Sequence, residues 1–301
     1  MLYYWIKMNN QLYFAGLVTH NTSKYLNKHL VHEPFELLVK NLGIESSCVQ
    51  FEDHYSKGDF TFFDVLNQLR QVMVLLITQC NIYLKIFYNV SNYYKINLLK
   101  IFFDIFYLTS KRLLLIFFAT FSIKYKNILE LLVYRQSNIS YSHISLLTIG
   151  LESGKPWVLI VEDDIEFECI EDVQLGLEIA LHTFALDKEI IMINLSESFS
   201  LNELGLEGFC AEVPLLNSLS KFSVYTINYP ATNTVCATIY RSESLRDLIL
   251  QLNQMNPFSL IPIDIKMNLA LHRLVKSSVV KSSAYSTMIP GLFVQGSLVD
   301  E

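Results

Sequence analysis

Three adjacent carboxylates, Glu162, Asp163 and Asp164, are the residues of this sequence best suited to chemistry. They directly follow the apolar run Trp157 to Val161, whose unbroken hydrophobicity is typical of a strand buried on both faces. Three neighbouring negative charges repel one another unless a cation or hydrogen-bond donors compensate for them. Carboxylates bind hard divalent cations, and phosphate oxygens fill the remaining positions around Mg²⁺ or Mn²⁺. The triplet therefore predicts a divalent metal site at the end of a strand, where ligands bind in α/β sheets.

The triplet has two other possible interpretations. A solvated acidic turn would also explain it, because Glu166 and Glu168 continue the acidic pattern in alternation. A receiver domain has a similar acidic pair after its first strand, but it also needs a phosphoacceptor aspartate at the end of a later strand. The next apolar strand, Glu189 to Asn194, lacks such an aspartate. The first aspartate that follows this strand in the sequence, Asp247, lies in an expected helix. The receiver interpretation is therefore disfavoured.

The elements that must position this triplet alternate between strand and helix from Ser137 onward. Such alternation predicts an α/β fold with a mostly parallel sheet flanked by helices. The expected elements are a helix over Asp172–Phe184, strands over Glu189–Asn194, Phe222–Asn228 and Thr234–Tyr240, a helix from Ser242 to about Met255, and a last helix over Ile265–Val275. We therefore assign residues 136–301 to the main catalytic α/β part.

The first 67 residues have a mixed α/β pattern, so we assign residues 1–67 to the N-terminal part of the same domain. An apolar strand is expected near Leu2–Ile6, a helix near Pro34–Leu42 and a strand over Ser47–Phe51.

Residues 68–135 are predicted to form a helical insertion, because they contain neither glycine nor proline. The longest uncharged runs, Val72–Leu84 and Leu113–Ile123, are shorter than the roughly 20 apolar residues that a spanning helix needs. Within this insertion, residues 81–135 hold eight basic residues and two acidic ones. The basic residues are Lys85, Lys95, Lys100, Lys111, Arg112, Lys124, Lys126 and Arg135. The helices could pack on the catalytic core, or they could present a basic, aromatic face to an anionic membrane surface.

The overall composition excludes some classes of protein. The formal net charge of −6 argues against a nucleic-acid-binding protein, which needs clustered positive charge. The five cysteines are odd in number and include no C-x-x-C pair, so a disulfide framework or a cysteine zinc site is not expected. We also expect no signal peptide at the N-terminus. These patterns predict a cytoplasmic protein, with residues 81–135 as a possible contact to the inner face of the membrane.

Four blocks of the sequence resemble, in order, glycosyltransferase family 25 of lipopolysaccharide biosynthesis, which is similar to β-galactosyltransferases. They are ISYSHISLL (139–147), PWVLIVEDDIEF (156–167), TNTVCATIYRSESL (232–245) and IPIDIKMNLAL (261–271). The resemblance implies a GT-A-like nucleotide-sugar-binding sheet and an enzyme that transfers a hexose, such as galactose, with inversion. The donor would be a nucleotide-diphosphate sugar, as in UDP-sugars, and the acceptor a hydroxyl of a surface glycan, lipopolysaccharide or lipid-linked glycan.

The same resemblance implies roles on the donor side. Asp164 would bind the metal, Glu162 would bind the metal or its waters, and Asp163 would contact the donor ribose. Ser142 and His143 match the Ser-His pair of the family, with Ser142 in substrate binding and His143 as a hydrogen-bond donor near the diphosphate.

On the acceptor side, Asp264 matches a late aspartate of the family. An inverting transfer needs a carboxylate that removes the acceptor hydroxyl proton, and Asp264 could be that base. It could equally be the N-cap of a helix that follows Pro262. Asn268, one turn later on the same helix face, could reach the same pocket.

Two interpretations from other classes remain open. One is a catalytically silent glycan-binding module of the same fold. The other is a membrane-surface assembly module organised by the helical insertion.

Overall fold

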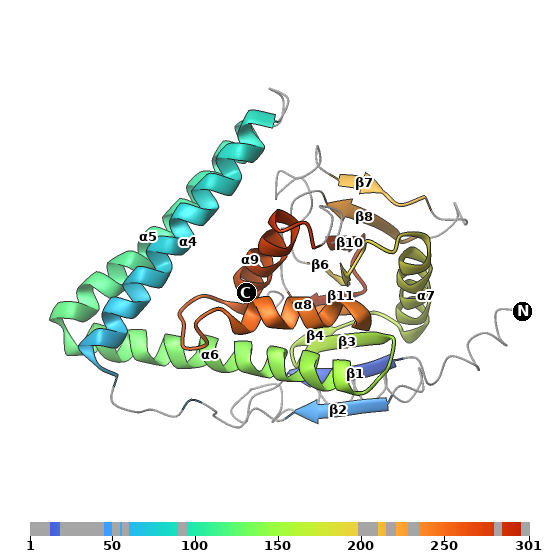
Figure 1. Ribbon diagram of the computed structural model, residues 1–301, viewed down its shortest axis with the longest axis horizontal. Helices are drawn as coiled ribbons and strands as arrows, with labels where there is room; N and C mark the ends of the chain where they lie inside the picture. The colour runs from blue at the N-terminus through green and yellow to red at the C-terminus, as the bar shows by residue number, and fades with distance from the viewer. Residues whose placement is uncertain are drawn as a thin grey trace, which may run out of the picture.

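The computed structural model describes residues 13–18, 45–49, 55, 60–89, 95–197, 210–214, 221–227, 235–279 and 285–295. The strand expected near residues 2–6 and the helix expected near 34–42 lie outside these ranges. Figure 1 shows a layered α/β body beside an arm of long helices.

An eight-stranded sheet in the order β2-β1-β3-β9-β5-β10-β8-β7 forms the centre of the body. Six of these strands run in one direction, and only β8 and β9 run the other way. The α/β class and the common direction of most strands agree with the sequence prediction, but the sheet is mixed because β9 and β8 each lie antiparallel to both neighbours. The strands are β1 (Tyr13–Val18), β2 (Glu45–Val49), β3 (Trp157–Glu162), β5 (Met192–Asn194), β7 (Cys210–Glu212), β8 (Ser223–Ile227), β9 (Ala237–Arg241) and β10 (Tyr285–Ile289).

A smaller sheet of three strands extends this body. Its strands are β4 (Ile165–Glu166), β6 (Ser196–Glu197) and β11 (Phe293–Gln295), in the order β4-β11-β6. Strand β4 begins directly after the acidic triplet, so Glu162 ends β3 and the other two carboxylates occupy the tight turn between the two sheets.

Helices cover both faces of the large sheet. Helices α6 (Ile123–Glu152), α8 (Ser242–Asn253) and α9 (Ile263–Lys276) pack on one face, and α7 (Ile170–Leu186) packs on the other. The sequence of β3 is continuously apolar because its two faces enter different cores. Val158 and Ile160 enter the first core, whereas Leu159 and Val161 enter the second.

Three long helices form the predicted helical segment. They are α4 (Phe62–Asn89), α5 (Lys95–Phe121) and the first half of α6, and they share a small core with Leu260 of the main body. The side chain of Gln68 on α4 fastens the arm, because Nε2 donates to Phe258 O at 3.1 Å and Oε1 accepts from Leu260 N at 2.8 Å. In the part of the chain that the structure describes, no helix combines the length and apolarity needed to span a membrane.

Helix α6 continues without a break from the arm onto the sheet, where two glycines allow it to lie close. A Cβ atom on Gly150 of α6 would lie 2.6 Å from Cγ1 of Val158, and a Cβ atom on Gly16 of β1 would lie 2.8 Å from Cδ2 of Leu146. Both distances are shorter than real contacts allow. The small residues therefore fix the distance between α6 and the sheet.

We expect Gly150→Ala to destabilise the protein. Alanine favours a helix over glycine by up to about 1 kcal/mol, but overpacking against Val158 costs about 1–3 kcal/mol, so a net loss is expected. Urea unfolding of the single variants and of Gly150→Ala/Val158→Ala tests this. The double variant should lose less stability than the sum of the two single losses, because the smaller residue makes room for the new methyl group. A Gly150→Ala protein as stable as the original would contradict the close approach.

Candidate metal centre and active site

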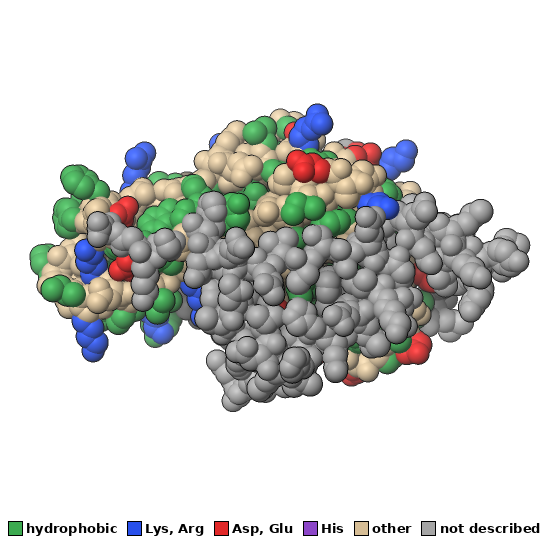
Figure 2. All heavy atoms as spheres, turned by 90° about the horizontal axis from the view of Figure 1, so that it is seen from below, with side chains coloured by type: hydrophobic (Ala, Val, Ile, Leu, Met, Phe, Trp, Pro, Cys, Tyr) green, Lys and Arg blue, Asp and Glu red, His purple; other side chains and the backbone are tan. Residues whose placement is uncertain are grey.

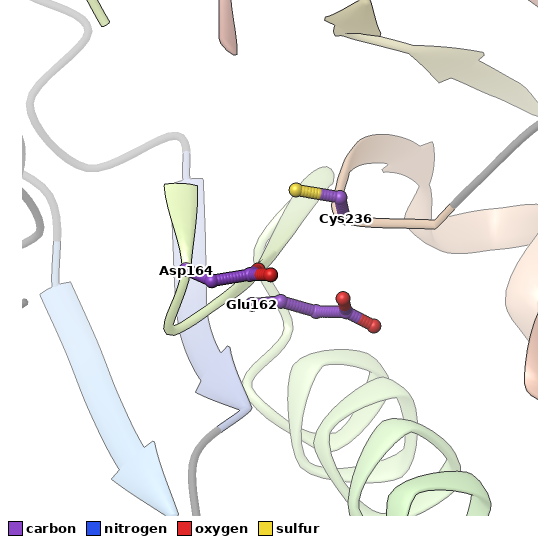
Figure 3. A group of neighbouring side chains, drawn as sticks. All are labelled: Glu162, Asp164 and Cys236. Atoms are coloured by element: carbon purple, nitrogen blue, oxygen red, sulfur yellow. The ribbon is translucent and has the colours of Figure 1, made fainter. Parts of the chain in front are cut away.

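Glu162, Asp164 and Cys236 bring possible metal ligands together at the end of β3. One ligand atom of each residue lies within 4.8 Å of those of the other two. Figure 3 shows that the three side chains come from the last residue of β3, the turn after it and the segment before β9. The antiparallel pairing of β3 with β9 creates this meeting, and Glu162 N donates to Cys236 O at 2.7 Å. Cys236 was not predicted as a site residue.

The two carboxylates fit a hard divalent cation. Ligands around such an ion lie about 2.0–2.6 Å from it, so ligand atoms of one ion are at most about 5 Å apart. The spacing of 4.8 Å or less falls within this limit. The thiol behaves differently, because burial, followed by the negative charges of Glu162, Asp164 and Asp163, raises the pKa of Cys236 well above its ordinary value. Glu162 and Asp164 are therefore the candidate ligands for an ion such as Mg²⁺ or Mn²⁺, and Cys236 would join only a softer ion that displaces its proton.

His143 supports Glu162 from helix α6. Its Nε2 atom lies 3.0 Å from Oε1 of Glu162, and its side chain is fully buried. In the tautomer that carries its proton on Nε2, the imidazole donates this hydrogen bond to the carboxylate oxygen. A hydrogen bond of this kind fixes the orientation of a ligand carboxylate. Ser142, the neighbour of His143, is also buried, at 2% exposure.

Asp264 lies in the first turn of α9, within electrostatic reach of Glu162. Burial raises its pKa, the charge of Glu162 raises it further, and the backbone N–H of Ile265 and the positive charge of Arg112 lower it. The structure corrects one expectation here, because the N-cap of α9 is Pro262, with φ −60° and ψ 156°, and Asp264 is inside the helix. Proline permits the extended backbone of an N-cap, so α9 begins directly after Pro262 and not after Asp264.

The remaining predicted residues lie at the edges of this site. Asp163 shares the turn with Asp164 and is partly exposed. Asn268 is also partly exposed and follows Asp264 by one turn of α9. The structure therefore gathers Glu162, Asp164 and His143 in direct proximity, and the charge of Glu162 reaches Asp264.

Arg112 is the second site residue that sequence reasoning did not find. The sequence left open whether its basic segment packs on the core or faces a membrane, and the structure places Arg112 partly buried on α5, where its charge acts on Asp264. Burial lowers the pKa of Arg112, and the charge of Asp264 opposes this change. The two residues are distant in sequence, so only the folded chain shows that the charge of Arg112 reaches Asp264.

No protein-family model matches the chain, and no curated protein matches it either. The chemistry of the site is therefore argued from its own geometry.

We expect Asp164→Asn to weaken Mn²⁺ binding by roughly tenfold or more, because it removes a charged ligand oxygen. Cys236→Ser should leave Mn²⁺ affinity nearly unchanged but weaken Zn²⁺ binding, since only the softer ion gains from a thiolate. Isothermal titration calorimetry with each metal measures both effects. Glu168→Gln removes an exposed carboxylate outside the cluster and is the matched control. Equal Mn²⁺ affinity in Asp164→Asn and the unmodified protein would refute the metal centre.

Proposed function

We propose that the protein is a metal-dependent hexosyltransferase that moves a sugar from a nucleotide-diphosphate donor to a hydroxyl of a glycan. One observation carries this proposal: side chains from four separate sequence blocks converge on Glu162. His143 hydrogen-bonds to it, Asp164 and Cys236 share its candidate metal cluster, and its charge raises the pKa of the already buried Asp264 carboxyl group. These are the four blocks that resemble glycosyltransferase family 25. The mixed sheet with helices on both faces is compatible with the GT-A-like fold that this resemblance implies.

The donor side of the site follows from the acidic turn. Glu162 and Asp164 would hold the divalent cation, which when bound neutralises the charge of the departing diphosphate. His143 keeps the Glu162 carboxylate in place through its hydrogen bond, so it acts as a positioning residue. Asp163, on the partly exposed side of the turn, is available to the donor ribose.

The acceptor side is assigned to Asp264 and Asn268. An acceptor hydroxyl oxygen forms a bond to the anomeric carbon as the bond to the diphosphate oxygen breaks, and the hydroxyl proton passes to Asp264. A carboxylate whose pKa is raised is a stronger base than an ordinary aspartate, which suits this step. Asn268 would hydrogen-bond another hydroxyl of the acceptor. The acceptor oxygen attacks from the side opposite the leaving diphosphate, so the configuration inverts.

We expect release of free nucleotide from at least one nucleotide sugar, because transferases leak some donor to water. The assay is a panel of UDP-, GDP- and CDP-sugars with Mn²⁺ or with chelator. Asp164→Asn should lose the signal. Asp264→Asn should lose transfer to an added glycan acceptor by roughly 10²-fold or more, the contribution typical of a general base.

The stability of Asp264→Asn provides the control for this experiment. The raised pKa means that the folded protein binds a proton at Asp264 more tightly than the unfolded chain does. Stability from this group therefore falls as the pH rises from the ordinary aspartate pKa through the raised one. Asparagine cannot ionise, so the variant should be at least as stable as the original at neutral pH.

Metal-independent nucleotide release, or none with any donor, would argue against a metal-dependent transferase.

The helical arm offers a surface for a membrane-bound acceptor. Large apolar side chains are exposed along α4, α5 and the start of α6, among them Phe63, Tyr88, Phe121 and Ile123 at 78–80% exposure. Figure 2 shows hydrophobic and basic side chains together at the end of the molecule where these helices meet. Exposed apolar surface of this extent marks an interaction site, and the excess of basic residues matches an anionic lipid surface. We therefore propose that the arm rests on the inner face of a membrane, near a lipid-linked glycan acceptor.

We expect the protein to co-sediment with vesicles that contain phosphatidylglycerol and not with vesicles of phosphatidylcholine alone. Reversing the charges of Lys111, Lys124 and Lys126 should abolish most of this binding. Arg112 is left unchanged, because it faces Asp264. Lys188→Glu, an exposed substitution beyond α7, is the control and should bind normally. Binding that persists after the three reversals, or no binding at all, would contradict the membrane surface.

A further inference from the structure

A cavity of about 430 Å³ lies between α4, α9 and the segment that joins α8 to α9. None of Glu162, Asp164, Cys236 and Asp264 lines it, so it is distinct from the candidate metal centre. Its size falls within the range of small-molecule sites, roughly 300–1,000 Å³.

The charge of the cavity has one sign. Arg70 of α4 and Lys266 and Arg273 of α9 are among its lining residues, together with His272. No aspartate or glutamate is among the described residues that line it. The protein as a whole carries a net charge of −6, so a cavity lined only by basic charges is not explained by composition.

Lys266 is the most unusual of these residues, because it is only 3% exposed. Its Nζ atom donates to Oγ of Ser140 on α6 at 3.1 Å. Burial lowers the pKa of Lys266 to about 8, and no carboxylate contributes to that change. A lysine has three N–H donors, and burying its charge without an anionic partner is costly. An anion in the cavity would satisfy both the charge and the remaining donors.

The neighbouring side chains extend this anion site along the helices. Lys266 and Arg273 lie two turns apart on one face of α9, a separation of about 10 Å along the helix axis. Arg70 faces them from α4, and Asn67 and Asn256 add polar groups to the lining. A phosphate carries up to two charges, and arginine binds its oxygens in a bidentate manner. Several separate cations suit a phosphate or diphosphate ligand better than a ligand with a single carboxylate.

We propose that this cavity binds a phosphate or diphosphate ester, with Lys266 as the buried anchor and Arg70 and Arg273 as the outer cations. The proposal does not depend on the transferase activity. The same group could belong to a soluble phosphorylated compound or to the headgroup of a lipid, since the outer cations lie on the arm and on the helix next to it.

The first experiment measures binding of inorganic pyrophosphate to the full chain by calorimetry. Chelator is present throughout, so that the metal centre does not bind the probe. We expect binding that weakens at high salt. Lys266→Met should reduce the affinity at least about tenfold while keeping or raising the melting temperature, because it removes a buried charge. Lys188→Met, an exposed substitution outside the cavity, should bind as the original does.

The second experiment separates the two sources of the phosphate group. Vesicles with phosphatidic acid are compared with vesicles of equal charge made with phosphatidylglycerol, which lacks a phosphomonoester. A preference for phosphatidic acid that Lys266→Met removes indicates a lipid headgroup, whereas binding of pyrophosphate without that preference indicates a soluble ligand. If Lys266→Met unfolds, Arg70→Gln/Arg273→Gln replaces it. Binding of neither probe, or equal binding by folded variants, overturns the proposal.

Discussion

The repulsion among carboxylates at the end of β3 is the constraint on which the rest of the site depends. Glu162 and Asp164 lie close together at the carboxyl end of β3, and their charges add to burial in raising the pKa of the Cys236 thiol. The charge of Glu162 also raises the pKa of Asp264 across the site. Such an arrangement is unfavourable unless positive charge or donors compensate for it. His143 and Arg112 supply part of this compensation, and a divalent cation between the carboxylates would supply more.

The fold holds these groups together through three long-range contacts. The reversed direction of β9 brings its first residues next to the last residue of β3. The glycines at positions 16 and 150 let α6 lie close to the sheet, so that His143 reaches Glu162. The arm, fastened through Gln68, carries Arg112 to α9. Each contact joins segments that are far apart in the chain, so the arm is part of the site and not only an attachment to it.

Sequence patterns predicted the helices and strands of this fold better than they predicted which of these elements lie next to each other. The buried strand β3, helices α7 and α9 and the helical character of residues 68–135 follow from hydrophobic periodicity and the absence of glycine and proline. The direction of β9 and the place of Cys236 depend on strand pairing, which local periodicity does not encode. Strand β1 was missed, because its six residues contain a glycine and lack a clear alternation. The position of Arg112 was left open between the core and a membrane-facing surface, because charge in a sequence does not reveal what packs against it.

Helix α9 separates Lys266, which is buried, from Asp264, which is partly exposed. Asp264 and Lys266 are two residues apart, so their side chains leave the helix in roughly opposite directions. The pKa of Asp264 responds to Glu162 and Arg112, and that of Lys266 responds to burial alone. A buried lysine kept only for stability would gain most from pairing with a carboxylate, since an unpaired buried charge is costly. Their separation by one helix instead supports two different ligands, a cation and an acceptor on the acidic side and an anion on the basic side.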